Sequence, residues 1–256
     1  MSALSALVLA GSRGGIDPVA QYAGVTHKAL IPLGGATLLE RVMGALKAAG
    51  ATRIAVCSND HAVAQLAAQR GAETSPAQSS LSASVRAGIE LLGAPVLITT
   101  SDHALLQADW IKQFVDDAPA ESDICVLLAR RDVVEAAAPS TQRTYLKFAD
   151  GQWSGCNLFL IRTPRALSAI DLWRKVEADR KKPWRIVRLL GPATLQRYIL
   201  GRLTLADAVA RMGRLSGIDA AVVASKFGLA AVDVDKPADL DLVRTLVSEP
   251  SPPNGP

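Results

Sequence analysis

The chain has 256 residues, of which 49% are apolar and 20% charged, and its formal net charge at pH 7 is +4. This length buries a sizeable core and favours one domain with an insertion over two domains, in an ordinary globular composition. The charge is too small to indicate nucleic-acid binding, no apolar run approaches the roughly 20 residues of a membrane-spanning helix, and three widely spaced cysteines argue against disulfides or a cysteine zinc site. We therefore expect a cytoplasmic protein with reduced thiols.

The first predicted element is an apolar strand, Ala6 to Ala10, that runs directly into the glycine-rich turn 11–15. Glycine lets backbone amides face an anion without a Cβ in the way, and Arg13 adds a fork of donors for phosphate oxygens. Lys28 follows as a point charge shortly before a Pro-Leu-Gly-Gly turn. These features favour a triphosphate-binding site, with a tight strand-to-helix turn and a surface arginine as the alternative.

Two other nucleotide-binding motifs do not fit this turn. A Walker A loop requires Gly-x-x-x-x-Gly-Lys-Ser/Thr, and no such string follows the first strand. Short-chain reductases have a similar turn but need a catalytic Tyr-x-x-x-Lys. None of Tyr22, Tyr145 and Tyr198 has a lysine four residues later, so the reductase chemistry is missing.

Short apolar runs then alternate with longer amphipathic stretches as far as residue 129. Apolar spacing predicts helices over 38–49 and 60–71 and a third helix from Ser82, and apolar runs predict strands over 53–57, 96–100 and 124–129. This alternation predicts an α/β fold of three layers, α/β/α, around a mostly parallel central sheet.

The pattern changes in the second half of the chain. Apolar runs on both sides of Asp150-Gly151 predict a β-hairpin within about 143–162. Residues 164–216 are mostly helical and basic in pattern, with interruptions at Pro183 and at Gly191-Pro192. We expect this stretch to be a helical insertion.

A final strand is predicted over 230–234, followed by a helix that begins near Pro237. The sequence thus predicts a single domain over 1–248. The tail 249–256 is rich in Pro, Ser and Gly, and we expect it to be disordered.

The string Leu-Ala-Gly-x-Arg-Gly, followed by Lys-Ala-Leu-x-Pro-Leu-Gly-Gly and a helix, resembles the MobA-like NTP transferase family. These are nucleotidyltransferases of the GT-A-like fold, and they include the molybdenum-cofactor guanylyl- and cytidylyltransferases. The resemblance implies catalytic roles for Arg13, Lys28 and Asp102. It implies that the nucleotide binds on the first turn, at Ala10, Gly11, Ser12, Gly14 and Gly15. The spacer from Gly15 to Lys28 is longer than in the molybdenum-cofactor enzymes.

Two carboxylate sites are candidates for metal binding. Asp102 follows the predicted strand 96–100, at the edge where open α/β sheets place ligands, although a helix cap is an alternative. Asp233 and Asp235 lie two apart at the end of the predicted final strand, where extended backbone would give them a shared face, with a capped helix as the alternative. The resemblance implies that Asp102 and Asp235, with Asp233, hold Mg²⁺, which takes one or two carboxylates plus substrate phosphates.

The serine-rich segment 79–88 resembles the Gly-Leu-Ser-x-Ser-Leu-Arg-x-Gly segment of the cytidylyltransferases. This resemblance implies that Ser82 and Ser84 bind the nucleotide, since hydroxyls and free helix amides bond a base or ribose without adding charge. The Gly-Pro-Leu-type segment of the guanylyltransferases is missing. CTP is therefore favoured over GTP, with a plain helix cap as the alternative.

The predicted hairpin lies where the family binds its second substrate, so Arg143, Lys147 and Asn157 are candidates to hold an acceptor phosphate. A solvated edge strand is the alternative. The stretch 174–202 carries nine Lys and Arg against two acidic residues, a local net charge of +7, interleaved with Trp and Leu. Such a stretch suits an anionic membrane surface or an amphiphilic acceptor, or is a solvated face. We expect peripheral contact with the inner membrane face.

The sequence therefore predicts an Mg²⁺-dependent nucleotidyltransferase that moves a nucleoside monophosphate from an NTP to a phosphorylated, lipid-like acceptor and releases pyrophosphate. An ionised acceptor phosphate needs no general base. Two alternatives stay open: a GT-A glycosyltransferase with a nucleotide-sugar donor, and a non-catalytic nucleotide-binding or membrane-associated regulatory protein.

Overall fold

The structure is a computed structural model that describes residues 4–12, 14–15, 17–170, 172 and 191–248. Its strands are β1 (Leu4–Leu9), β2 (Pro32–Leu33), β3 (Ala36–Thr37), β4 (Ala51–Ser58), β5 (Glu73–Pro76), β6 (Val96–Thr100), β7 (Ile124–Arg130), β8 (Leu146–Phe148), β9 (Gly151–Ile161) and β10 (Ala220–Ser225). Its α-helices are α1 (Pro18–Tyr22), α2 (Leu38–Ala48), α3 (His61–Gln69), α4 (Leu81–Leu92), α5 (Ala108–Asp117), α6 (Arg131–Ala137), α9 (Pro192–Ile199), α10 (Leu205–Leu215) and α11 (Pro237–Ser248). Three 3₁₀ turns complete them: η1 (Lys28–Leu30), η2 (Pro164–Ala166) and η3 (Gly228–Ala231).

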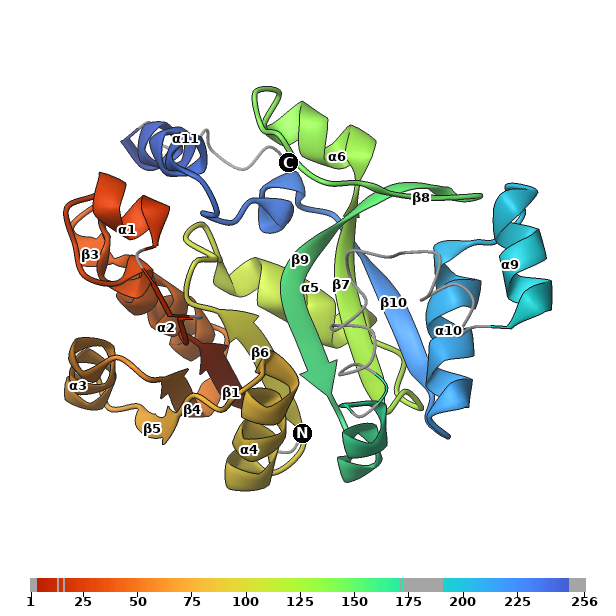
Figure 1. Ribbon diagram of the computed structural model, residues 1–256, viewed down its shortest axis with the longest axis horizontal. Helices are drawn as coiled ribbons and strands as arrows, with labels where there is room; N and C mark the ends of the chain where they lie inside the picture. The colour runs from red at the N-terminus through yellow and green to blue at the C-terminus, as the bar shows by residue number, and fades with distance from the viewer. Residues whose placement is uncertain (1–3, 13, 16, 171, 173–190, 249–256) are drawn as a thin grey trace.

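The central sheet has eight strands in the order β10-β7-β9-β6-β1-β4-β5, with β8 paired to β9. β1 pairs in parallel with β4 and β6, and the pairs β4–β5 and β7–β10 are also parallel. β9 is inserted between β6 and β7 and runs antiparallel to both (Figure 1). The predicted α/β fold with a mostly parallel sheet is confirmed.

Side chains alternate between the two faces along each strand, so a hydrophobic core forms on each side of the sheet. In β1, Ala6 and Val8 face one cluster together with α2, α3, α5 and α11, whereas Leu7 faces a second cluster together with α4. A third, smaller cluster joins α10 to β7 and β9. In Figure 1, α10 lies beside β10 at one end of the sheet, with α9 beyond α10, and α3 lies beside β5 at the other end. Helices therefore cover both faces, which makes the three predicted layers.

Several local features form for the reasons that the sequence indicated. Asp60 caps α3 by accepting a hydrogen bond from the amide of Val63. Gly151 begins β9 with φ at +135°, so the predicted turn at Asp150-Gly151 joins β8 to β9. The three cysteines are buried and unbridged.

One predicted strand is wrong, and one helix begins a residue earlier than predicted. Residues 230–234 form no strand: Gly228–Ala231 is a 3₁₀ turn, and the place beside β7 is taken by β10, which the sequence analysis missed. The run is apolar because Ala230 to Val232 are buried in the core, not because they pair. The predicted helix from Ser82 is confirmed as α4, which begins at Leu81 because the Ser80 hydroxyl accepts from the amide of Ala83 and caps it.

The predicted basic insertion is described only in part. Residues 191–216 contain α9 and α10, which confirms the helical pattern there. Most of the basic stretch, 173–190, and the predicted disordered tail, 249–256, lie outside the described residues. Within the described part of the chain, no helix is long and apolar enough to cross a membrane.

We expect Gly88→Ala to destabilise the protein. A Cβ at Gly88 would lie 2.3 Å from Cδ2 of Leu7, which is fully buried in β1 and cannot swing away. Overpacking of this kind costs about 1–3 kcal/mol of the free energy of unfolding, measured here by urea denaturation.

Gly44→Ala is the matched control, because Gly44 is also inside a helix but is exposed, with nothing within 4 Å of its Cβ position. It should stabilise the protein by about 0.5–1 kcal/mol. Equal effects of the two substitutions would contradict the close contact between α4 and β1.

Candidate functional site

Three residues that are far apart in the sequence meet at the carboxyl end of the sheet. The Nζ atom of Lys28 lies 2.7 Å from Oδ2 of Asp102 and 3.4 Å from Oδ1 of Asp235. The side chains of Lys28 and Asp102 are 18% and 13% exposed, whereas that of Asp235 is 60% exposed. One ammonium group thus bridges a nearly buried carboxylate and a solvent-facing one.

Local backbone structure places Lys28 and Asp102. Lys28 opens the 3₁₀ turn η1, where the Nδ1 atom of His27 accepts a hydrogen bond from the Ala29 amide at 3.1 Å. Asp102 lies two residues beyond the end of β6, as the sequence predicted, and the Thr100 hydroxyl donates to its Oδ1 atom. Thr100 was not among the predicted site residues, although its place at the end of the same strand is a signal in the sequence.

Asp235 is positioned by its own helix. A carboxylate oxygen of Asp239, in the first turn of α11, accepts from the amides of Asp235 and Lys236 at 3.1 and 2.8 Å. The amide of Val234 donates to the carbonyl of Asp102 at 3.1 Å. The segment before α11 is therefore tied by its backbone to the segment after β6, which brings the two carboxylates together.

The charges in this cluster shift each other's pKa values. Burial disfavours the charged form of Lys28, but the Asp102 and Asp235 carboxylates outweigh it and raise the pKa of the ammonium group. Desolvation, followed by the carboxylates of Asp233 and Asp102, raises the pKa of Asp235 despite the opposing effect of Lys28. Solvent screens the repulsion at Asp235, since that side chain is more than half exposed.

The next residue, His103, takes no part in this charge cluster. It is completely buried and packs near Trp110, with ring centroids 6.2 Å apart. Burial lowers its pKa to about 4, so the imidazole is neutral at physiological pH.

The glycine-rich turn begins directly after β1. Gly14 and Gly15 have φ values of +80° and +86°, which favour glycine, while Arg13 lies outside the described residues. The side chain of Asn59 accepts from the Ser12 amide at 3.1 Å and donates to the Ser12 carbonyl at 3.4 Å. Asn59 thus holds the turn in place. The sequence analysis missed it, although it is a polar residue just past the end of β4.

Asp233 does not join Lys28. It is buried in an ion pair with Arg143, and the amide nitrogen of Asn157 donates to its Oδ2 atom at 2.5 Å. Because 230–234 is not a strand, Asp233 and Asp235 make different contacts, contrary to the shared face expected from the sequence. Asn157 has φ at +49°, near a register shift between β7 and β9.

The three predicted acceptor residues are not brought together. Arg143 and Asn157 both engage Asp233, but Lys147 is exposed on β8 and lines a separate surface hollow with Arg130 and Arg131. Burial disfavours the charged form of Arg143, and the carboxylates of Asp233, Asp239 and Asp235 raise its pKa. This cation is therefore held by acidic groups of the chain itself.

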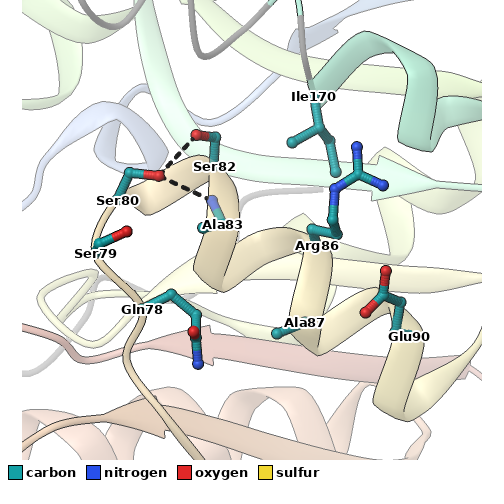
Figure 2. Close-up of a pocket in the computed structure, with 9 residues that line it drawn as sticks. All are labelled: Gln78, Ser79, Ser80, Ser82, Ala83, Arg86, Ala87, Glu90 and Ile170. Carbon is teal, nitrogen blue, oxygen red and sulfur yellow. Dashed lines mark hydrogen bonds between the residues drawn. The ribbon is translucent and has the colours of Figure 1, made fainter.

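Of the two predicted nucleotide serines, Ser82 lines a groove along α4 and Ser84 does not (Figure 2). Ser82 is buried and its hydroxyl lies 3.0 Å from that of Ser80; Ser84 is buried and accepts from the Gln78 amide at 2.8 Å. The groove has a volume of about 480 Å³ and is lined by Gln78, Ser79, Ser80, Ser82, Ala83, Arg86, Ala87, Glu90 and Ile170. Residues 78–80 follow Ala77, whose Cβ would be 3.1 Å from a Cβ at Gly11, so the groove begins beside the glycine turn.

A divalent cation fits the carboxylate pair. The described residues contain no group of three or more His, Cys, Asp or Glu side chains arranged to hold a metal ion. Asp102 and Asp235 nevertheless direct oxygens at one cation, the Lys28 ammonium. Mg²⁺ needs only one or two carboxylates when substrate phosphates supply further oxygens.

This chain is similar to known transferases. The sequence profile of the MobA-like NTP transferase domain matches residues 6–181. No curated protein matches the chain in sequence. A structure described as a hypothetical transferase from Thermus thermophilus is 31% identical, with a TM-score of 0.79 over 93% of this chain and 99% of that one.

Two more distant structures share the fold. CMP:2-keto-3-deoxy-manno-octonic acid synthetase, solved with CTP, is 17% identical with a TM-score of 0.57, over 96% of this chain and 99% of that one. The 2-C-methyl-D-erythritol 4-phosphate cytidylyltransferase from Thermus thermophilus is 17% identical with a TM-score of 0.53, over 96% and 100% of the two chains.

The raised pKa of Asp235 predicts how the stability of the protein changes with pH. Its pKa in the folded state lies above the ordinary value of 3.8, so the folded state holds this proton more tightly than the unfolded state. The associated stability is present below pH 3.8 and is lost as pH rises through the folded pKa. Without metal, Asp235→Asn should therefore be more stable than wild type near pH 7, and the difference should vanish below about pH 3.8.

Urea denaturation across this pH range checks the sign. Asp117→Asn is the control, because hydrogen bonds from Gln113 and Lys226 lower the pKa of Asp117, so its removal should weaken the protein near pH 7. If Asp235→Asn also weakened the protein near pH 7, burial and the neighbouring carboxylates would not disfavour the charged form of Asp235 as expected.

Proposed function

Because this chain belongs to the MobA-like NTP transferase family, we propose that it transfers a nucleoside monophosphate from an NTP to a phosphorylated acceptor and releases pyrophosphate. The observation that carries this proposal is the bridge from Lys28 to Asp102 and Asp235 beside the glycine turn. A cation-binding carboxylate pair, an ammonium group and an anion-binding turn are the parts that nucleotidyl transfer requires.

Each part has a role in the proposed reaction. The triphosphate lies on the turn formed by Gly11, Ser12, Gly14 and Gly15, with Arg13 and Lys28 as its positively charged partners. Asp102 and Asp235 would hold Mg²⁺, which when bound supplies positive charge to the phosphate oxygens. An oxygen of the acceptor phosphate attacks the α-phosphorus, the bond to the oxygen that bridges to the β-phosphate breaks, and that oxygen leaves with pyrophosphate.

Positioning and charge stabilisation carry this reaction. The attacking oxygen belongs to an ionised phosphate and bears no proton, so a general base is not needed. The neutral, buried His103 is consistent with this chemistry, because it does not have to act as one.

CTP is the donor that we favour. The groove beside the glycine turn offers the uncharged polar side chains of Gln78 and Ser79, which suit the hydrogen-bonding edge of a base. We place the base there rather than on Ser82 and Ser84, whose hydroxyls are engaged inside the protein. Two proteins with this fold, one solved with CTP and one called a cytidylyltransferase, add support for a cytosine nucleotide.

The acceptor is a phosphorylated molecule, and an amphiphilic one suits the chain. Tyr198, Ile199 and Leu200 at the end of α9 are 41%, 72% and 55% exposed, close in sequence to Arg197 and Arg202. Apolar side chains beside cations match a phosphate attached to an apolar group. A screen for pyrophosphate release with soluble and lipid-linked phosphates separates the two kinds of acceptor.

We expect CTP to raise the melting temperature more than GTP, UTP or ATP, and only with Mg²⁺ present. A ligand at about 100 times its dissociation constant adds roughly 2.7 kcal/mol of stability. Differential scanning fluorimetry with each NTP measures this effect. A nucleotide-sugar preference with release of a nucleoside diphosphate would point to a glycosyltransferase, and binding that is independent of Mg²⁺, without turnover, to a regulatory protein.

Lys28→Ala and Asp102→Ala should each lower kcat/KM by about 10²–10³ or more, because each removes a charge that stabilises the transition state. Pyrophosphate release with CTP and an accepted phosphate measures the loss, and circular dichroism verifies folding. Lys226→Ala and Asp109→Ala are matched controls on the exposed surface and should keep wild-type activity. Near-wild-type rates for either Lys28→Ala or Asp102→Ala would remove the residue from the mechanism.

A further inference from the structure

We propose that Lys28 is the resident cation of the nucleotide-free site and that a divalent metal must displace it to bind Asp102 and Asp235. The inference rests on the proposed function and adds a regulatory step to it. Metal alone binds weakly because Lys28 competes for the same oxygens. Metal and triphosphate bind tightly together because the phosphates give the displaced ammonium group a new partner.

The contacts leave little room for both cations. Lys28 Nζ lies 2.7 Å from Oδ2 of Asp102, while the Thr100 hydroxyl occupies the other oxygen, Oδ1. The same Nζ atom faces Oδ1 of Asp235 at 3.4 Å. A Mg²⁺ ion would need these oxygens at about 2.0–2.1 Å. A metal bridging the two carboxylates therefore has to take the position that the ammonium group holds.

Charge and burial make the competition strong. Lys28 and Asp102 are largely buried, so water screens their attraction only weakly. A divalent ion that joined the cluster while Lys28 stayed would place two positive centres within a few ångströms of each other, where little water screens their repulsion. The two carboxylates balance one divalent ion by themselves. The Lys28 ammonium group then has no negatively charged partner until the phosphates of the nucleotide bind.

The backbone allows this exchange without refolding. The amide of Ala29 is held by the His27 ring, and the carbonyl of Lys28 accepts from the Ile31 amide at 3.1 Å. Only the flexible side chain of Lys28 has to turn. The glycine turn that we propose for the triphosphate follows β1, whose end pairs with the end of β6, two residues before Asp102. Nucleotide and metal are thus coupled through one side chain, and the coupling is reciprocal.

The test is Mn²⁺ binding to the full chain without nucleotide, followed by electron paramagnetic resonance. Lys28→Met keeps the length of the side chain and removes the charge, and it should bind Mn²⁺ at least about tenfold more tightly than wild type. The double variant Lys28→Met/Asp102→Asn should lose this gain. Equal or weaker binding by a folded Lys28→Met would overturn the exchange.

A second measurement uses the wild type, in case Lys28→Met does not fold. Acetylation of lysine amines at low conversion, followed by peptide mass spectrometry, reports whether the Lys28 amine is engaged. Saturating Mn²⁺ should speed labelling of Lys28 and leave the exposed Lys226 unchanged. If Lys28 stays equally protected with Mn²⁺ bound, the proposal fails.

These outcomes are separable from the proposed function because neither measurement involves turnover. Tighter Mn²⁺ binding in Lys28→Met with no pyrophosphate release from any NTP in wild type supports the exchange and contradicts the transferase. Pyrophosphate release in wild type with unchanged Mn²⁺ affinity in Lys28→Met supports the transferase and contradicts the exchange.

Discussion

The attraction between Lys28 and two carboxylates joins three parts of the chain that are distant in sequence. Asp102 extends from the central strand β6, Asp235 precedes the last helix, and Lys28 stands on a 3₁₀ turn after the glycine-rich segment. Burial, and after it the carboxylates of Asp233 and Asp102, raise the pKa of Asp235, so its charged form is disfavoured without a positive partner. A cation is therefore a requirement of this edge of the sheet, and the surrounding segments are arranged to keep one there.

Asp233 and Asp235, although close in sequence, have different surroundings and different roles. Asp233 is buried against Arg143 and Asn157, and such a pair is costly to break because an unpaired charge would be left inside. Asp235, two residues later, is exposed: Asp239 holds its backbone amide, and its carboxylate faces Lys28. The first anchors the segment, and the second remains available to a ligand. This division arises because β9 and its irregular residue Asn157 approach the segment from the sheet.

Much of the fold and the family could be predicted from local pattern. Apolar runs and helical spacing identified β1, β4, β6 and β7, and the family prediction from the glycine-rich turn and the Lys-Ala-Leu-x-Pro-Leu-Gly-Gly string is confirmed. The last strand was misplaced, because a buried apolar run and a strand look alike in sequence. Only the register of β10 against β7 decides that 220–225 pairs and that 230–234 does not.

By itself, the sequence determined the order of the elements and which residues could carry charge to the edge of the sheet: periodicity and strand ends are local properties. The tertiary structure alone decided which charges meet. Asp102 and Asp235 share Lys28, Arg143 is taken by Asp233, Lys147 stands apart, and Asn59 holds the Ser12 turn. Electrostatic and hydrogen-bond partners depend on distances across strands and loops, and these distances exist only after the chain has packed.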